Sequence, residues 1–537
     1  MPKSANSRSG KRSWLFPAVL ALAAPIGGMD EVHAQEIMEL RRGLHAEPDT
    51  LDPHQATLKT SWYVLGDLYE GLTRADVAGR PAPGAAHSWN VSEDGLTWTF
   101  FLRPDLKWSD GAPLTAEDFE AGFRRLFDPA VASKNAVFLD MIVNADEIVR
   151  GTLPEDALGV RAVDAHTLQI ELEHPVPQLA VLLSAAFASP LPRHAVRAGG
   201  IDSFRTGGTV TNGAYRLREW NLNSSIELTR NENYWDAEQV AIDRVIYFPI
   251  TSESAALNRF RSGGLDIVSW FGLPQHQWLE RNSPEAIHTP PALFVTYLVF
   301  NSSVTPFDDA RLRKALSLAI DRRIITDNIL RIDDEPTFHF VPAGVSNYDS
   351  LPRREEELTA AERHTEALAL MAQAGHGPRA PLNFEFRVRN GDDERRTALA
   401  IADMWQEIGA IAEITITDLA AHYADLEEAN FSVADAGWSV FDAPELFLDL
   451  MRSETGAFNY GNYSNSAFDA LLDRALSMPD IEQRHQLMAE AQSLMLDDQP
   501  VAPLYFNVSR YIVSPRISGF VDNPADIHLS RSMAIDD

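Results

Sequence analysis

The sequence predicts an α/β fold, and three observations within residues 85–119 support this prediction. Residues 96–103 alternate between two faces and are rich in aromatic and β-branched side chains, which is typical of a strand. Asp94-Gly95 precedes them and predicts a tight turn of a hairpin. Thr115 and Asp118, three residues apart, have the form of a capping box and predict the start of a helix.

Further segments extend this pattern along the chain. The expected helices either follow a capping signal or carry apolar residues at helical spacing. One short helix is expected to end at Gly71, because glycine suits the position after a helix. Strands are expected near 39–44, 164–172, 242–248, 382–386 and 414–416, and helices near 309–320, 359–374, 394–408, 468–476 and 481–496.

Composition limits the function classes. The 537 residues include 45% hydrophobic and 23% charged residues, an ordinary globular balance with room for several domains. The formal net charge of −31 disfavours nucleic acid and anionic membranes as partners, because both repel an acidic surface. The chain has no cysteine, which excludes disulfides, zinc–thiolate sites, iron–sulfur clusters and a cysteine-linked lipid anchor.

Residues 1–34 have the features of a secretory signal peptide. Four basic residues come first, an apolar run follows over 14–24, and Val32-His33-Ala34 resembles a cleavage site. The apolar run is too short to span a bilayer, so an uncleaved anchor is the minor alternative. Lys11-Arg12 only weakly resembles a twin-arginine export signal. We therefore expect a periplasmic protein without a lipid anchor.

A long ordered series of motifs resembles one protein family. It closely resembles the signature block of the peptide-binding receptors of bacterial ABC importers, the family 5 extracellular solute-binding proteins, which include oligopeptide, dipeptide and nickel receptors. The motifs are Pro81-Ala82-Pro83-Gly84, Ser88-Trp89, Trp98-Thr99-Phe100 with Leu102-Arg103, Lys107-Trp108-Ser109-Asp110-Gly111 and Thr115-Ala116-Glu117-Asp118-Phe119.

The resemblance implies a two-lobed periplasmic-binding-protein (type II-like) fold with an additional accessory domain. The implied boundaries are a signal peptide over 1–34, lobe I over 35–59, 190–292 and 506–537, an accessory domain over 60–189, and lobe II over 293–505. It also implies a receptor without catalytic residues or cofactors. Such a receptor captures an extended peptide between its lobes and delivers it to a permease in the inner membrane.

The resemblance places the ligand site around Ala436-Gly437-Trp438. In peptide-binding members this strand pairs with the peptide backbone, and an acid three residues after the tryptophan receives the α-ammonium group. Here Phe441 stands at that position and Asp442 follows it. Asp435 stands where some members carry an arginine that pairs with a ligand carboxylate. Two acids here favour an amine-bearing or cationic ligand, because a buried carboxylate needs a partner; the alternative is loop acids paired with arginines.

Glu47 lies in a segment that also resembles the family, where members enter the cleft. It is expected either to contact the ligand or to be a solvated loop carboxylate. The six expected ligand-binding residues are therefore Glu47, Asp435, Gly437, Trp438, Phe441 and Asp442. We expect no metal site, although nickel or haem bound by lone histidines is an open alternative within this family.

Enzyme motifs are missing from the sequence. It contains no Gly-x-Ser-x-Gly, no Ser-x-x-Lys, no P-loop and no histidine pair at helical metal-binding spacing. We therefore expect a monomeric peptide receptor that works with an ABC permease. The alternatives are a receptor of the same fold for a nickel chelate, an opine or another cationic metabolite, and a secreted hydrolase built on this scaffold.

Overall fold

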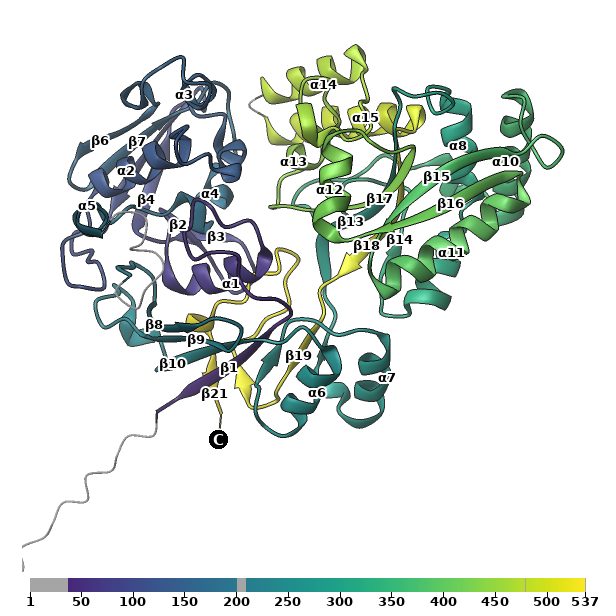
Figure 1. Cartoon of the computed structure of the whole chain (residues 1–537). Coiled ribbons are helices and arrows are strands. Elements are labelled where there is room, and N and C mark those ends of the chain that lie inside the picture. Colours follow the sequence, from purple (N-terminus) through teal and green to yellow (C-terminus); the bar gives the residue numbers. More distant parts are fainter. Residues whose placement is uncertain (1–36, 200–208, 479, 537) are drawn as a thin grey trace, which may run out of the picture. The chain divides into compact units, whose positions relative to one another are not determined.

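A computed structural model describes residues 37–199, 209–478 and 480–536. The expected signal peptide over 1–34 lies outside these residues. The described residues from 38 to 536 belong to one unit, which contains three larger β-sheets (Figure 1). No helix among the described residues is both long enough and apolar enough to cross a membrane.

The first sheet has seven strands and brings together segments from both ends of the chain (Figure 1). Its order is β12-β19-β11-β1-β10-β9-β8, and β1 pairs in parallel with both β10 and β11. The strands are β1 (Glu39–Leu44), β8 (Tyr215–Asn221), β9 (Ser225–Arg230), β10 (Arg244–Pro249), β11 (Ile267–Val268), β12 (Ile287–His288) and β19 (Tyr511–Val513).

Two short helices pack near this sheet. Helix α1 (Lys59–Leu68) shares its hydrophobic core, and helix α6 (Glu253–Arg261) packs against β11. The expectation that α1 ends at Gly71 is wrong, because the helix stops at Leu68. A Cβ on Gly71 would collide with the carbonyl oxygen of Leu183, so glycine there allows two backbone segments to approach closely.

The second sheet is antiparallel, with the order β4-β5-β7-β6. Its strands are β4 (Ala86–Val91), β5 (Thr97–Leu102), β6 (Val160–Asp164) and β7 (Thr167–Glu171). The alternation predicted for 96–103 is confirmed, since Trp98, Phe100 and Leu102 are buried. Helix α2 (Ala116–Phe127) packs on β6 and β7, and its capping box forms, with the Asp118 carboxylate accepting the Thr115 N–H at 3.0 Å.

The third sheet has six strands, in the order β14-β18-β13-β17-β15-β16. The strands are β13 (Pro291–Phe300), β14 (Glu335–Pro336), β15 (Leu382–Arg389), β16 (Ala410–Thr417), β17 (Val433–Ser439) and β18 (Val501–Val508). Tyr297 and Val299 belong to one hydrophobic cluster, whereas Leu298 and Phe300 belong to another. Because successive strand residues point to opposite faces, both faces of this sheet are buried.

Helices supply many of the other residues of both clusters. The helices of this region are α8 (Ala310–Ala319), α10 (Ala360–Gln373), α11 (Asp392–Glu407), α12 (Leu419–Glu427), α14 (Ser466–Leu476) and α15 (Ile481–Asp498). The helices expected from the sequence near these positions are confirmed within a few residues. The capping signals also form: Asp309 accepts the Arg311 N–H at 2.9 Å, and Glu362 accepts the Thr359 N–H at 2.8 Å.

Candidate functional site

The second half of strand β17 has a ladder partner on one side only among the described residues. It pairs with β13 over its whole length, but with β15 only at Val433 and Ala434. Beyond them, the Asp435 carbonyl accepts a hydrogen bond from the His422 ring at 2.7 Å, and the Gly437 N–H reaches the Tyr423 hydroxyl at a long 3.3 Å. This edge can therefore accept an extended chain as an added strand.

Asp435 does not present a free carboxylate at this edge. The residue is only 6% exposed, and its carboxylate accepts hydrogen bonds from the Arg389 backbone N–H at 2.9 Å and from Arg389 Nε at 2.7 Å. Burial lowers the pKa of Arg389, but Asp435 outweighs this and raises that pKa above its ordinary value. The Asp435 charge is thus compensated within the protein.

Gly437 and Trp438 lie at the end of β17, where the free edge begins. A Cβ on Gly437 would lie 2.7 Å from the Phe294 ring, so a larger residue would displace either the strand or the ring. Trp438 donates its indole N–H to the Leu446 carbonyl at 3.0 Å and meets Phe458 edge-to-face at 6.1 Å. These contacts fix the orientation of the indole.

Phe441 belongs to an aromatic cluster. Its ring stacks on Trp62 at 6.2 Å and meets Phe138 and Phe187 edge-to-face at 5.6 and 5.7 Å. The side chain that replaces the acid of the family pattern is therefore held by apolar packing.

Asp442 is half-buried and is engaged by the loop between β14 and α9 (Arg354–Glu357). Its carboxylate accepts the backbone N–H of Ser346 at 2.6 Å and also the Ser346 hydroxyl. This loop, which contains Pro342 and Pro352, thus contacts the residue after Phe441.

Glu47 is likewise engaged within the protein. One carboxylate oxygen accepts the indole N–H of Trp220 at 2.7 Å, and the other accepts the backbone N–H of Asn223 at 3.0 Å. Glu47 therefore anchors a turn beside β8, and it is not among the residues that line the cavity beside β17.

A cavity of about 700 Å³ lies beside the end of β17. One wall comes from segments around β17 and α15, and the other from residues 134–182 together with Trp62. Its apolar lining residues include Trp62, Phe138, Met141, Val176, Leu182, Trp438, Leu446, Leu450 and Phe458, and its charged ones are Lys134, Asp140, Asp146, Glu445, Asp449, Arg452, Glu454 and Arg484. Aromatic and aliphatic walls with a few polar groups are typical of a small-molecule site.

One buried arginine joins the two walls. Arg484 is fully buried and donates to the Glu445 carboxylate at 2.9 Å and to the Pro175 carbonyl at 2.8 Å. Glu445 and Pro175 come from opposite walls, so these hydrogen bonds connect the two walls.

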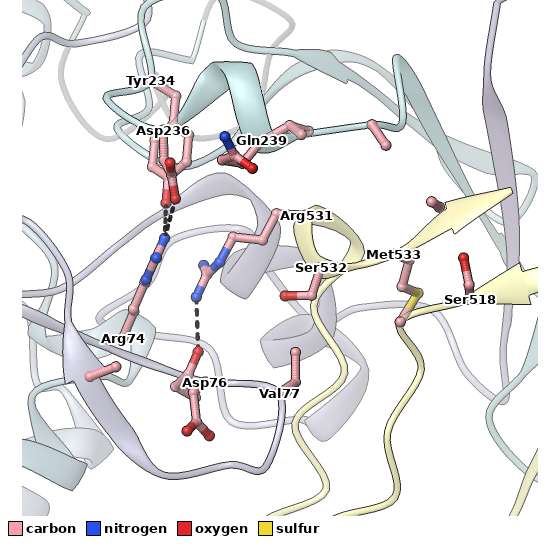
Figure 2. Close-up of a pocket in the computed structure, with 16 residues that line it drawn as sticks. Arg74, Asp76, Val77, Tyr234, Asp236, Gln239, Ser518, Arg531, Ser532 and Met533 are labelled. Atoms are coloured by element: carbon pink, nitrogen blue, oxygen red, sulfur yellow. Dashed lines mark hydrogen bonds and ion pairs between the residues drawn. The ribbon is translucent and has the colours of Figure 1, made fainter.

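A second cavity, of about 560 Å³, lies away from β17 (Figure 2). Its two arginines already have partners: Arg74 pairs with Asp236 at 2.9 Å, and Arg531 donates to the Ala75 carbonyl at 3.2 Å. Because these charges are compensated within the wall, we take the cavity beside β17 as the candidate site.

The described part of the chain can also be compared with the requirements of a metal site. Within it, no group of three or more histidine, aspartate or glutamate side chains is arranged to hold a metal ion. The candidate site is therefore described by its free strand edge, its aromatic wall and its acidic residues.

Sequence reasoning identified the β17 segment but missed much of the cavity. Asp140 and Asp449 are far apart in sequence and belong to no motif, so no local pattern places them together. Glu445 was not predicted either, and its position shortly after the Ala-Gly-Trp motif is the sequence signal that could have found it. The Arg389 partner of Asp435 carried no signal beyond the general expectation that a buried acid is paired.

Comparisons with known proteins agree with this geometry. The family described as bacterial extracellular solute-binding proteins, family 5 (middle), matches residues 80–459. The periplasmic murein peptide-binding protein MppA of Escherichia coli is 34% identical, over 93% of this chain and 94% of that protein. The periplasmic oligopeptide-binding protein OppA of Salmonella typhimurium is 34% identical, over 94% and 93%. The probable deoxycholate-binding periplasmic protein YgiS of Escherichia coli is 31% identical, over 98% and 99%.

Solved structures show the same similarity. The Escherichia coli murein tripeptide binding protein MppA has a TM-score of 0.85 at 33% identity, covering 94% of this chain and 99% of that one. Haemophilus influenzae OppA in complex with the peptide RPPGFSPFR has a TM-score of 0.82 at 29% identity, with 94% and 99% covered.

Proposed function

The chain belongs to family 5 of the bacterial extracellular solute-binding proteins, and from this premise we propose that it captures extended peptides and delivers them to an ABC permease. The observation that carries the proposal is the free edge of β17 beside the cavity. Relatives named as oligopeptide- and murein peptide-binding proteins support it.

The strand edge explains how peptides of varied sequence can bind. The backbone of an added strand forms its hydrogen bonds whatever its side chains are, so affinity need not depend on sequence. Gly437 presents its N–H and carbonyl on the side of Tyr423, and Ser439 continues the strand into the cavity wall. A bound peptide takes the place of the long hydrogen bonds to the Tyr423 hydroxyl.

A receptor must also signal that it is loaded. A ligand that touches both walls stabilises the form in which the walls are close, whereas equal affinity for open and closed forms would shift nothing. The link from Arg484 to Glu445 and Pro175 and the ring of Phe441 on Trp62 stabilise the same form.

The remaining parts of the proposal follow the family. The protein releases its ligand chemically unchanged, acts as a monomer in the periplasm after removal of residues 1–34, and leaves ATP hydrolysis to other subunits. The boundaries of the two lobes and of the accessory domain expected from the sequence remain part of this proposal.

One specific observation favours a second candidate, a non-peptide ligand. Phe441 is packed in an aromatic cluster and Asp442 is engaged by Ser346, so the family's acid for an α-ammonium group has no direct equivalent. A relative named as a probable deoxycholate-binding protein shares most of the chain length.

Extraction of the purified protein under denaturing conditions, followed by mass spectrometry, separates the two candidates. A ladder of short peptides supports the leading proposal, and a single non-peptide compound contradicts it. Re-incubating the native protein with the identified compound tests for turnover, since a receptor returns it intact and a hydrolase does not.

A backbone test addresses the strand edge itself. A tripeptide N-methylated at one amide at a time loses one donor without losing its side chains. Methylating the amide that pairs with β17 should weaken binding roughly fivefold on calorimetry, because one intermolecular hydrogen bond contributes about 1 kcal/mol. If no methylated position weakens binding, strand addition at β17 is wrong.

The role of Asp442 has its own test. If its carboxylate receives the ligand ammonium group, Asp442→Asn should cost roughly 2–5 kcal/mol of binding free energy. Ser346→Ala removes the hydroxyl that holds Asp442 and is the matched control. An unchanged affinity for Asp442→Asn would assign Asp442 to the loop contact alone.

A further inference from the structure

The cavity beside β17 carries more acidic charge than its own cations compensate. Arg484 is paired with Glu445, and Arg452 is shared between Asp449 at 2.8 Å and Asp473 at 2.8 Å. Asp140 lies in the opposite wall, and no arginine, lysine or histidine of the described residues forms an ion pair with it.

Asp449 lies close enough to influence the ionisation of Asp140, and both residues line the cavity. Withdrawal from water, followed by the charges of Asp449, Asp146 and Glu173, raises the pKa of Asp140 to about 7. Burial raises the pKa of Asp449 to about 6, although Arg452 lowers it. The two carboxylates come from opposite walls, so a cation between them would relieve the repulsion of both.

Unsatisfied polar atoms along the same wall point to a ligand independently. Glu445 is only 7% exposed, and its second carboxylate oxygen has no hydrogen-bond partner among the described residues. Buried polar atoms in native proteins nearly always have partners, so this carboxylate oxygen leaves room for a water molecule or a donor group of a ligand. The other cavity-lining residues with such atoms are His174, Gln178, Arg452 and Arg484.

The apolar part of the cavity defines what carries the cation. Trp438 and Phe458 line the region next to the acids, together with aliphatic residues such as Leu450. Ser439 belongs both to the free strand edge and to the cavity wall, so a side chain leaving a peptide bound at that edge enters this cavity. An aliphatic stem with a terminal charge matches both parts of the lining.

We propose that this cavity takes the side chain of a basic residue of the peptide, an ammonium or guanidinium group on an aliphatic stem, with Asp140 and Asp449 as its counter-ions. The inference rests on the proposed peptide-binding function and adds a specificity to it. A basic side chain gains two charge-assisted contacts here, whereas an uncharged chain of the same length gains only the apolar contacts.

The test compares lysine with norleucine, which has a straight uncharged chain. The probes are Lys-Ala-Ala, Ala-Lys-Ala and Ala-Ala-Lys with their three norleucine counterparts, measured by calorimetry on the full mature chain at pH 8. At one position lysine should bind at least tenfold more tightly than norleucine. Equal affinities at all three positions overturn the inference and leave the peptide-binding proposal standing, whereas no binding by any of the six contradicts the proposed function itself.

Variants locate the preference. Asp140→Asn should remove most of the lysine preference while leaving norleucine affinity unchanged. Asp449→Asn should have the same effect, and it provides the test if Asp140→Asn does not fold. Asp156→Asn is the matched control, because Asp156 is exposed and does not line the cavity. A preference that survives both cavity variants overturns the assignment.

The pH dependence supplies a second readout. Lowering the pH from 8 to 5.5 protonates Asp140 and weakens the lysine peptide, whereas the norleucine peptide should change little. The other titratable or charged groups that line this cavity or face Asp140 are Lys134, Asp146, Glu173, His174, Glu445, Asp449, Arg452, Glu454 and Arg484. If the lysine-to-norleucine ratio is the same at both pH values, carboxylates do not provide the preference.

Discussion

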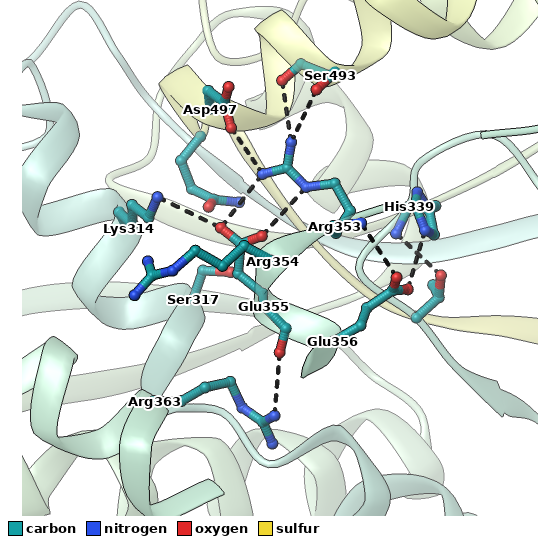
Figure 3. A network of polar contacts seen from close by, with 12 residues as sticks. Lys314, Ser317, His339, Arg353, Arg354, Glu355, Glu356, Arg363, Ser493 and Asp497 are labelled. Carbon is teal, nitrogen blue, oxygen red and sulfur yellow. Dashed lines mark hydrogen bonds and ion pairs between the residues drawn. The ribbon is translucent and has the colours of Figure 1, made fainter. Parts of the chain in front are cut away.

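Two clusters of charged side chains in this protein show opposite electrostatics. Around helix α9, Arg353 lies between Glu355 at 3.3 Å and Asp497 at 3.0 Å, and Lys314 approaches Glu355 at 3.4 Å (Figure 3). In the cavity beside β17, Asp140 has no such neighbour among the described residues. Withdrawal from water alone would raise the pKa of either carboxyl group, although Glu355 is buried and Asp140 is exposed.

The direction in which the pKa of each carboxyl group shifts depends on which charges lie nearby. Arg353 and Lys314 outweigh burial and lower the pKa of Glu355, whereas neighbouring acids add to the effect of withdrawal from water and raise the pKa of Asp140. The cluster around α9 is self-sufficient and stabilises the fold. The cavity lacks a counter-charge that a ligand can supply. Surplus acid at a cavity therefore indicates function more clearly than burial does.

Breaking the compensated cluster should give the largest effect on stability. Arg353→Ala leaves the buried Glu355 with only Lys314 as a partner and should lower the free energy of unfolding by about 3 kcal/mol. Urea denaturation measures the change. Arg354→Ala is the matched control, because Arg354 pairs with Glu366 at the surface and its loss should leave the free energy of unfolding nearly unchanged. Equal losses for the two variants would contradict the comparison.

Removing an aromatic ring from the cavity wall should lower the free energy of unfolding somewhat less than Arg353→Ala does. Phe441→Ala removes the ring between Trp62, Phe138 and Phe187, and we expect a loss of about 2 kcal/mol because Phe441 is only half-buried. Thermal unfolding of the ligand-free protein measures it. Phe441→Leu keeps most of the apolar contact and should recover more than half of the loss; no difference between the two would show that the ring packing is unimportant.

The two clusters should respond to pH with opposite signs. The raised pKa of Asp140 makes its stabilising contribution complete at low pH and lost as the pH rises from its ordinary value of 3.8 to about 7. Because this carboxyl group is open to the cavity, the loss should be about 1 kcal/mol. Asp140→Asn should remove that slope from urea titrations of the ligand-free protein.

Glu355 should give the opposite dependence of stability on pH. Its lowered pKa makes its contribution complete above its ordinary value of 4.5 and lost only as the pH falls below that value. Glu355→Gln should reduce the loss of unfolding free energy at acidic pH and leave its pH dependence near neutral pH unchanged. Identical pH profiles for the two variants would mean that neighbouring charges do not distinguish the clusters.

The smallest effect should come from the loop contact of Asp442. Ser346→Ala removes one hydrogen bond to a half-exposed carboxylate and should cost about 0.5–1 kcal/mol in stability. A double-mutant cycle with Asp442→Asn measures the coupling directly. A coupling near zero would show that the contact contributes nothing measurable.

Much of the fold was predictable because its signals are local. Alternation in β5, the capping boxes of α2 and α10 and the ordered motif series each depend on neighbouring residues. Gly71 shows the limit: glycine after a helix favours a cap locally, but the close approach of Leu183 explains the residue here. That contact joins residues more than a hundred positions apart.

The site was predictable only along β17. The motif placed Gly437 and Trp438 at the ligand edge, but the compensation of Asp435 by Arg389 and the encounter of Asp140 with Asp449 depend on how separate segments pack. An argument from two acids near the motif pointed to a cationic ligand. The acids that now support this hypothesis are different ones, contributed by both cavity walls.

The aromatic wall has a practical consequence. Trp62 and Trp438 come from opposite walls of the cavity and both face its interior space. A ligand that enters displaces water from both indoles, so the emission wavelength of the unlabelled protein should report occupancy. Replacing either indole by phenylalanine would then assign the optical signal to one wall.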